Sequence, residues 1–112
     1  MWYNKYVNKR AELVKRKKGK HMLTYSALTA MPYAQAKVKR ETNRIVLISY
    51  TTEVAEIVGG CLIVHGLHSA TTRRHISAFV REYCGLPYQT ARACYDNNMA
   101  WDLIEKKFVV IS

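Results

Sequence analysis

The chain has 112 residues, 49% of them hydrophobic, which fits one folded domain and excludes an intrinsically disordered chain. It carries 18 Lys and Arg against 8 Asp and Glu, and this net charge of +10 favours polyanionic partners. No apolar run approaches the roughly 20 residues of a membrane span, and residues 1–10 lack the apolar core of a secretory signal, so neither class is expected.

The positive charge is concentrated near the start of the chain. Residues 1–44 contain twelve Lys and Arg and two acids, whereas residues 45–112 contain six of each sign. A charge asymmetry of this kind bears on partners rather than on fold. It predicts that a nucleic acid, or another polyanion, meets the first 44 residues.

The first predicted element is a basic helix. Asn4 is a suitable N-cap for a helix over residues 5–18, and Gly19 is a plausible stop. We expect residues 1–20 to form this basic N-terminal helix, attached to a single α+β domain over residues 21–112.

Several strands are expected next, with one less regular segment before them. Residues 21–34 have mixed periodicity and suggest irregular structure or a short strand. The predicted strands are 36–40 and 44–50 in a hairpin, a continuation of the second through 54–57 after a bend near 51–52, and 61–65 after the Gly59-Gly60 turn.

Two consecutive helices and a final hairpin complete the pattern. Ser69 or Thr71 caps a helix over 72–84, Gly85 and Leu86 fit a Schellman ending, and Pro87 opens a short helix to about residue 95. Residues 100–104 and 108–111 read as a hairpin. The predicted fold class is therefore α+β, a small antiparallel sheet of three to five strands packed by two consecutive helices, with a basic N-terminal helix.

The candidate binding residues are all cationic. They are Lys15, Arg16, Lys17, Lys18, Lys20, Lys37, Lys39, Arg40, Arg73, Arg74 and Arg81. The run at 15–18 is also explained as a helix end, where cations suit the helix dipole. Arg74 and Arg81, seven residues apart, share a helix face and are able to grip a phosphate, but an ordinary charged outer face explains them as well.

Aromatic residues accompany the basic segment. They are Trp2, Tyr3, Tyr6, Tyr25 and Tyr33. Cations with exposed aromatics hold single strands through phosphate charge and base stacking. The alternative is that these aromatics dock the N-terminal helix on the domain.

The sequence contains no clear catalytic or metal-binding motif. The three cysteines are odd in number and form no C-x-x-C, which predicts reduced thiols in the cytosol. The spacing of His65, His68 and His75 near Cys61 matches no metal pattern. Glu53 and Glu56, expected on opposite sides of a strand, offer no magnesium site. We predict no metal, no cofactor and no enzyme, with a small His-dependent nuclease as the weakest alternative.

The central part of the chain carries a motif of two strands and a helix start. The pattern is S-Y-x-T on a strand, a second strand, and S-x-T-T-x-R/K-H-I opening a helix. The residues that form it are Ser49-Tyr50-Thr51-Thr52, Val54-Ala55, Gly59-Gly60, Val64-His65-Gly66, Ser69-Ala70-Thr71-Thr72-Arg73-Arg74-His75-Ile76 and Phe79. This motif resembles a family of short, uncharacterised phage and prophage proteins of Gram-positive bacteria. The resemblance implies an accessory protein of a mobile element and supplies no catalytic residues.

The function expected is non-enzymatic binding of nucleic acid (RNA or DNA) or a nucleoprotein through the basic N-terminal region, in the cytosol of a bacterial host. The alternative is a phage-encoded anti-defence inhibitor, of the anti-CRISPR kind, that binds a host effector complex. No membrane partner is expected. An exposed edge at 108–111 would permit a homodimer.

Overall fold

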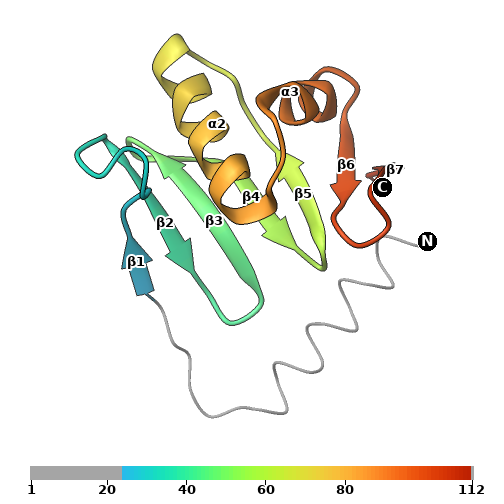
Figure 1. Ribbon diagram of the computed structural model, residues 1–112, viewed down its shortest axis with the longest axis horizontal. Helices are drawn as coiled ribbons and strands as arrows, with labels where there is room; N and C mark the ends of the chain where they lie inside the picture. The colour runs from blue at the N-terminus through green and yellow to red at the C-terminus, as the bar shows by residue number, and fades with distance from the viewer. Residues whose placement is uncertain (1–23, 112) are drawn as a thin grey trace.

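Seven antiparallel strands and two helices make up residues 24–111, the part of the chain that the computed structural model describes (Figure 1). Each strand pairs with the next along the chain, and the helices are inserted between the fifth and sixth strands. The elements are β1 (Thr24–Ser26), β2 (Ala36–Arg40), β3 (Arg44–Ser49), β4 (Thr52–Val58), β5 (Cys61–Val64), α2 (Ala70–Cys84), α3 (Tyr88–Asp96), β6 (Met99–Asp102) and β7 (Lys107–Val110).

Tight turns join the central strands. Gly59 and Gly60, with φ of 61° and 79°, connect the paired residues Val58 and Cys61 in a two-residue hairpin. Positive φ at both turn positions matches the twist of the flanking strands and suits glycine. The hairpins at 36–50 and near the C-terminus also form where the sequence predicts them, with ends shifted by one or two residues.

The predicted continuation of strand 44–50 through 54–57 is wrong. The chain reverses at Tyr50 and Thr51, and Ser49 pairs with Thr52 across the turn. Tyr50 adopts the left-handed conformation at φ 59°, which is uncommon for a bulky side chain. Its N–H donates to the carbonyl of Gln35 at 2.8 Å. This long-range bond holds a turn that contains neither glycine nor proline.

The prediction of three to five strands is therefore also wrong, since the described residues hold seven. One additional strand is β4, which the sequence pattern merged with β3. The other is β1, which lies in the segment 21–34 where the pattern is mixed. The predicted basic helix over 5–18 lies outside the described residues.

The larger hydrophobic core lies between the sheet and the two helices. Ile76, Phe79 and Val80 of α2 are fully buried and pack with sheet residues such as Val38 and Leu47. Helix α3 contributes Ala91 and Cys94 to the same core above β5 and β6. We call this side of the sheet the helix face. The opposite side, the second face, carries a smaller cluster around Cys61, Ile63 and Ala100.

Both ends of α2 are capped as the sequence indicates. The Ser69 hydroxyl accepts the N–H of Thr72 at 3.1 Å, so the helix begins at Ala70, two residues before the predicted start. At the other end Gly85 adopts φ 68°, and the Leu86 N–H donates to the Val80 carbonyl at 3.1 Å. This is the Schellman ending that Gly85 and Leu86 predict.

Replacing Gly85 with alanine tests the cost of the left-handed cap. An added Cβ meets no atom within 4 Å, so the loss comes from φ alone. We expect Gly85→Ala to lower the free energy of unfolding by about 1 kcal/mol in urea denaturation. Gly85→Asn is the control, and it should lose less because asparagine tolerates the left-handed region. Equal losses in the two variants would show that the conformation is not the cause.

Candidate functional site

Three arginines stand on the solvent side of α2. Arg73, Arg74 and Arg81 are exposed, on a helix whose other side supplies the core residues Ile76 and Phe79. Within residues 24–111, no hydrogen bond or ion pair engages the guanidinium of any of the three. These side chains are therefore available to a partner.

An open groove of about 500 Å³ runs between α2 and the loop that precedes β2. Its lining residues are Thr29, Ala30, Met31, Arg74, Ser77, Ala78, Arg81 and Glu82. Two of the three free arginines thus border a hollow with the apolar side chains Ala30, Met31 and Ala78. A volume of this size is within the range of small-ligand sites.

The loop wall of the groove is fixed to α2. The backbone N–H of Thr29 donates to one oxygen of the Glu82 carboxylate and its hydroxyl donates to the other, each at 2.8 Å. Leu28, fully buried, anchors the loop in the core, and the Met31 N–H donates to the Leu28 carbonyl at 3.2 Å. Both oxygens of Glu82, the acidic side chain among the lining residues, accept these bonds, which come from neutral donors and do not cancel its charge.

A buried polar cluster sets the position of α2 on the sheet. The hydroxyl of Ser49, at the end of β3, lies 2.8 Å from Nδ1 of His75 and 3.2 Å from the hydroxyl of Thr72. All three side chains are at least 96% buried. They belong to the S-Y-x-T and S-x-T-T-x-R-H-I segments of the sequence, so these two segments join strand to helix.

Burial keeps His75 neutral. It is 1% exposed, and the loss of solvation lowers its pKa from the ordinary value of 6.5. A neutral ring shares its hydrogen bond with Ser49 without placing a charge in the core. Both groups are closed off from solvent, which gives the pair a structural role.

Strand alternation divides the basic cluster of β2. Arg40 lies on the helix face, where its guanidinium stacks 5.5 Å from the ring centre of Tyr83 and donates to the Tyr83 hydroxyl at 3.3 Å. Lys37 and Lys39 lie on the second face, and Lys37 sits over the Tyr25 ring at 5.8 Å. The sequence predicts that Lys37, Lys39 and Arg40 contact one partner together. Such a partner would have to reach both faces of the sheet.

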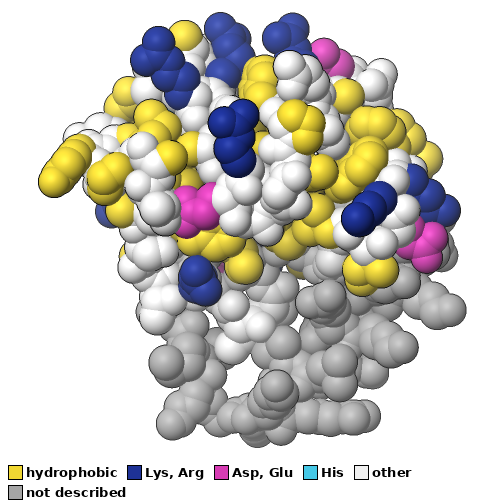
Figure 2. Space-filling model, in the orientation of Figure 1, with side chains coloured by type: hydrophobic (Ala, Val, Ile, Leu, Met, Phe, Trp, Pro, Cys, Tyr) yellow, Lys and Arg dark blue, Asp and Glu magenta, His cyan; other side chains and the backbone are white. Residues whose placement is uncertain are grey.

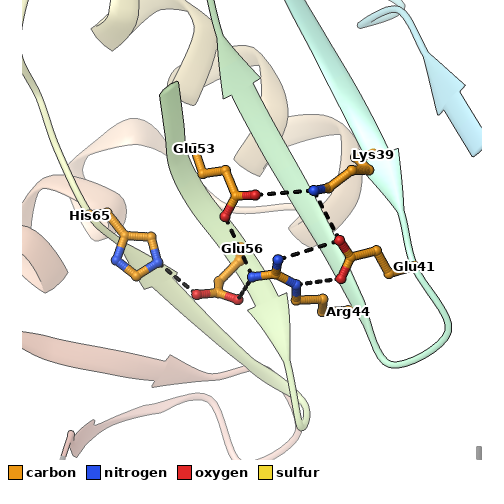
Figure 3. A network of polar contacts seen from close by, with 6 residues as sticks. All are labelled: Lys39, Glu41, Arg44, Glu53, Glu56 and His65. Carbon is orange, nitrogen blue, oxygen red and sulfur yellow. Dashed lines mark hydrogen bonds and ion pairs between the residues drawn. The ribbon is translucent and has the colours of Figure 1, made fainter. Parts of the chain in front are cut away.

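Lys39 is held in a network of charges on the second face (Figure 3). Its ammonium lies 2.9 Å from Glu41 and 3.1 Å from Glu53. Arg44 contacts Glu41 at 2.6 Å, Glu53 at 3.5 Å and Glu56 at 3.1 Å, and His65 contacts Glu56 at 2.6 Å. Hydrogen bonds from Arg44, then Lys39, lower the pKa of Glu41 to about 2. Three carboxylates thus offset two cations, and this region presents no excess positive charge.

The expectation that Glu53 and Glu56 face opposite sides is wrong, because both reach Arg44. The register shifts between Leu47 and Ile48, which pair with Ala55 and Glu53, so Val54 is an extra residue in β4. A β-bulge of this kind resets the alternation of side chains. The two carboxylates consequently share the second face.

The histidines do not assemble into one site. His65 binds Glu56 on the second face, whereas His75 is buried under α2 on the helix face. Across residues 24–111, no group of three His, Cys, Asp or Glu side chains is placed to hold a metal ion. Burial raises the pKa of the Cys84 thiol to about 12 and that of Cys94 to about 11, so neither is a ready nucleophile.

The structure thus brings together only part of the predicted surface. Arg74 and Arg81 meet at the groove, with Arg73 beside them on α2 and Arg40 on the same face. The cluster Lys15, Arg16, Lys17, Lys18 and Lys20 lies outside the described residues. Sequence reasoning missed Thr29, Ala30 and Met31, because the Thr29–Glu82 contact spans 53 positions and has no local signal.

Comparison with known proteins yields one match. Residues 13–96 match a family of unknown function (DUF8033), which covers the groove, the buried polar cluster and both helices. No curated protein and no solved structure matches the chain. Neither α2 nor α3, the two helices of the described region, is long and apolar enough to cross a membrane.

The depressed pKa of His75 predicts a pH dependence of stability. The folded chain binds fewer protons at this site than the unfolded chain. The contribution of the neutral His75 ring to the free energy of unfolding is therefore complete above pH 6.5 and decreases as pH falls below 6.5. We expect the loss to reach up to about 1.4 kcal/mol per pH unit below 6.5. Urea denaturation at pH 7.5 and 5.5 measures it.

The variant His75→Asn serves as the comparison, since its amide can still meet Ser49 but does not titrate. It should be less stable at pH 7.5 and lose less than the native protein on moving to pH 5.5. In the native protein, an NMR titration of the His75 ring should give a pKa below 6.5. A ring that titrates at or above 6.5 would contradict the assignment.

Proposed function

The chain belongs to the family of unknown function DUF8033, and we propose that it is a small non-enzymatic protein that binds nucleic acid on the helix face. The resemblance to phage proteins supports a role as an accessory factor of a mobile element. Arg73, Arg74 and Arg81 supply contacts to phosphate in this proposal, with Arg40 at the side.

The proposal rests on a difference in ion pairing between the acidic side chains of the described residues and the arginines of α2. Five of the seven acidic side chains of residues 24–111 have a cationic partner. Glu41, Glu53 and Glu56 are in the network on the second face, Asp96 accepts from Arg92, and Glu105 lies 3.9 Å from Lys107. Glu82 accepts from Thr29 and Asp102 accepts the N–H groups of Ile104 and Glu105, and these neutral donors do not cancel their charge. The three arginines of α2 have no partner within this part of the chain.

Residues 24–111 hold ten Lys and Arg against seven acids, and α2 alone holds three arginines against one acid, Glu82. Figure 2 views this side and shows Lys and Arg side chains spread over the helices, with fewer acidic ones. Residues 1–23 add eight Lys and Arg and a single acid. Neutralising phosphates with such cations releases condensed counterions, which is the main source of affinity for a polyanion.

Nucleic acid fits this surface better than a compact acidic protein does. The arginines are spaced along one helix, and Glu82 is the single acid that α2 contains. A row of separate cations suits a repeating charge such as a phosphate backbone. Backbone contacts of this kind carry little sequence information, so RNA and DNA are both expected to bind.

The triple variant Arg73→Gln, Arg74→Gln, Arg81→Gln tests this surface. Fluorescence anisotropy with labelled RNA and DNA oligonucleotides, at 50 to 200 mM salt, measures the affinity and its salt dependence. Each lost phosphate contact lowers the slope of log K against log salt by about 0.7–0.9, so we expect a decrease of roughly two. Affinity at low salt should fall at least about tenfold.

The matched control is Arg92→Gln, Lys106→Gln, Lys107→Gln, which removes the same charge elsewhere on the fold. It should keep most of the affinity, because Arg92 and Lys107 already have acidic partners. Equal losses in the two triple variants would mean that only total charge matters. Absence of binding to any oligonucleotide at low salt would refute the proposed function.

A further inference from the structure

The groove beside α2 combines two kinds of surface that a nucleic acid can use. Arg74 and Arg81 are seven residues apart, which places them about 10 Å apart along the helix axis. Ser77 lies between them and adds a hydroxyl to the lining. This row is suited to phosphate oxygens. Ala30, Met31 and Ala78 are suited to something apolar and flat.

Tyr33 adds an exposed aromatic ring at the edge of the same loop. It is 97% exposed and is two residues beyond Met31, hence within about 7 Å along the chain. The loop that carries it is not free to move away. It is held by the Thr29–Glu82 bonds, by buried Leu28, and by the Ala34 N–H, which donates to the Met31 carbonyl at 3.1 Å.

The loop is held in place and carries an exposed ring two residues beyond Met31, which lines the groove together with Arg74 and Arg81; these are features of a stacking platform. Proteins that hold single strands pair such rings with a cationic path for the backbone. A duplex keeps its base faces stacked inside, so it would reach the arginines but not the apolar lining. The chain's own segment 1–23 is a poor occupant, since it is strongly basic and Arg74 and Arg81 would repel it.

We infer that the groove binds a single-stranded segment of nucleic acid, with phosphates on Arg74 and Arg81 and a base on Met31 and Tyr33. This assignment rests on the proposed function and narrows its ligand to one class. Base stacking in the groove then favours single strands over duplex, while the arginines contribute to the binding of both forms.

Full-length protein and the variant Tyr33→Ala are compared by anisotropy on a 12-nucleotide oligodeoxythymidine and a 12-base-pair duplex. Loss of one stacked base should weaken binding to the single strand at least about fivefold, and change binding to the duplex less than twofold. Tyr33→Phe keeps the ring and should restore the affinity. Tyr95→Ala, which removes another exposed tyrosine from α3, is the matched control and should bind as the native protein does.

The outcomes separate this inference from the proposed function. If the arginine variants lose affinity but Tyr33→Ala binds the single strand normally, or weakens both ligands equally, the stacking site is refuted and nucleic-acid binding stands. If no oligonucleotide binds, both fail. If a 12-residue polyglutamate competes as well as oligodeoxythymidine, the groove is a site for acidic protein segments, which also overturns the inference.

Discussion

The hydroxyl of Ser49 shares one hydrogen bond with His75 and one with Thr72, and these two buried contacts hold α2 on the sheet. They link the end of β3 to the first two turns of α2, and they fix both the position and the rotation of the helix. With that rotation set, Ile76 and Phe79 point into the core, and Arg74 and Arg81 point outward to the groove. The bonds form in a buried site where an unpaired polar group would be costly, so they select one arrangement of helix on sheet.

Charge pairing gives the two faces of the sheet different surfaces. On the second face, Lys39 and Arg44 are matched by three glutamates, and the β-bulge at Val54 is what brings Glu53 and Glu56 to the same side. On the helix face, the arginines of α2 have no acidic partner among residues 24–111, and Arg40 stacks on the Tyr83 ring. The cations of the network are thus matched by carboxylates, whereas the arginines of α2 are not.

The sequence correctly predicted the caps and turns that are determined by neighbouring residues. The cap at Ser69, the glycine ending at Gly85 and the Gly59-Gly60 turn each depend on a few neighbouring residues, and each lies where the sequence indicates. The reversal at Tyr50 was missed because its support, the bond to Gln35, comes from another part of the chain. The groove was missed for the same reason, since its walls are 53 positions apart where Thr29 meets Glu82. The arginines of the site were predicted by their spacing, but their lack of acidic partners is visible only in the fold.

Amide NMR of the labelled protein, titrated with oligodeoxythymidine, locates the surface that a polyanion contacts. A site on the helix face should give shift changes that centre on residues 29–33 and 74–81, with little change at Lys39, Arg44 and Glu53 on the second face. Changes confined to the second face, or no changes among residues 24–111 at saturating ligand, would contradict it.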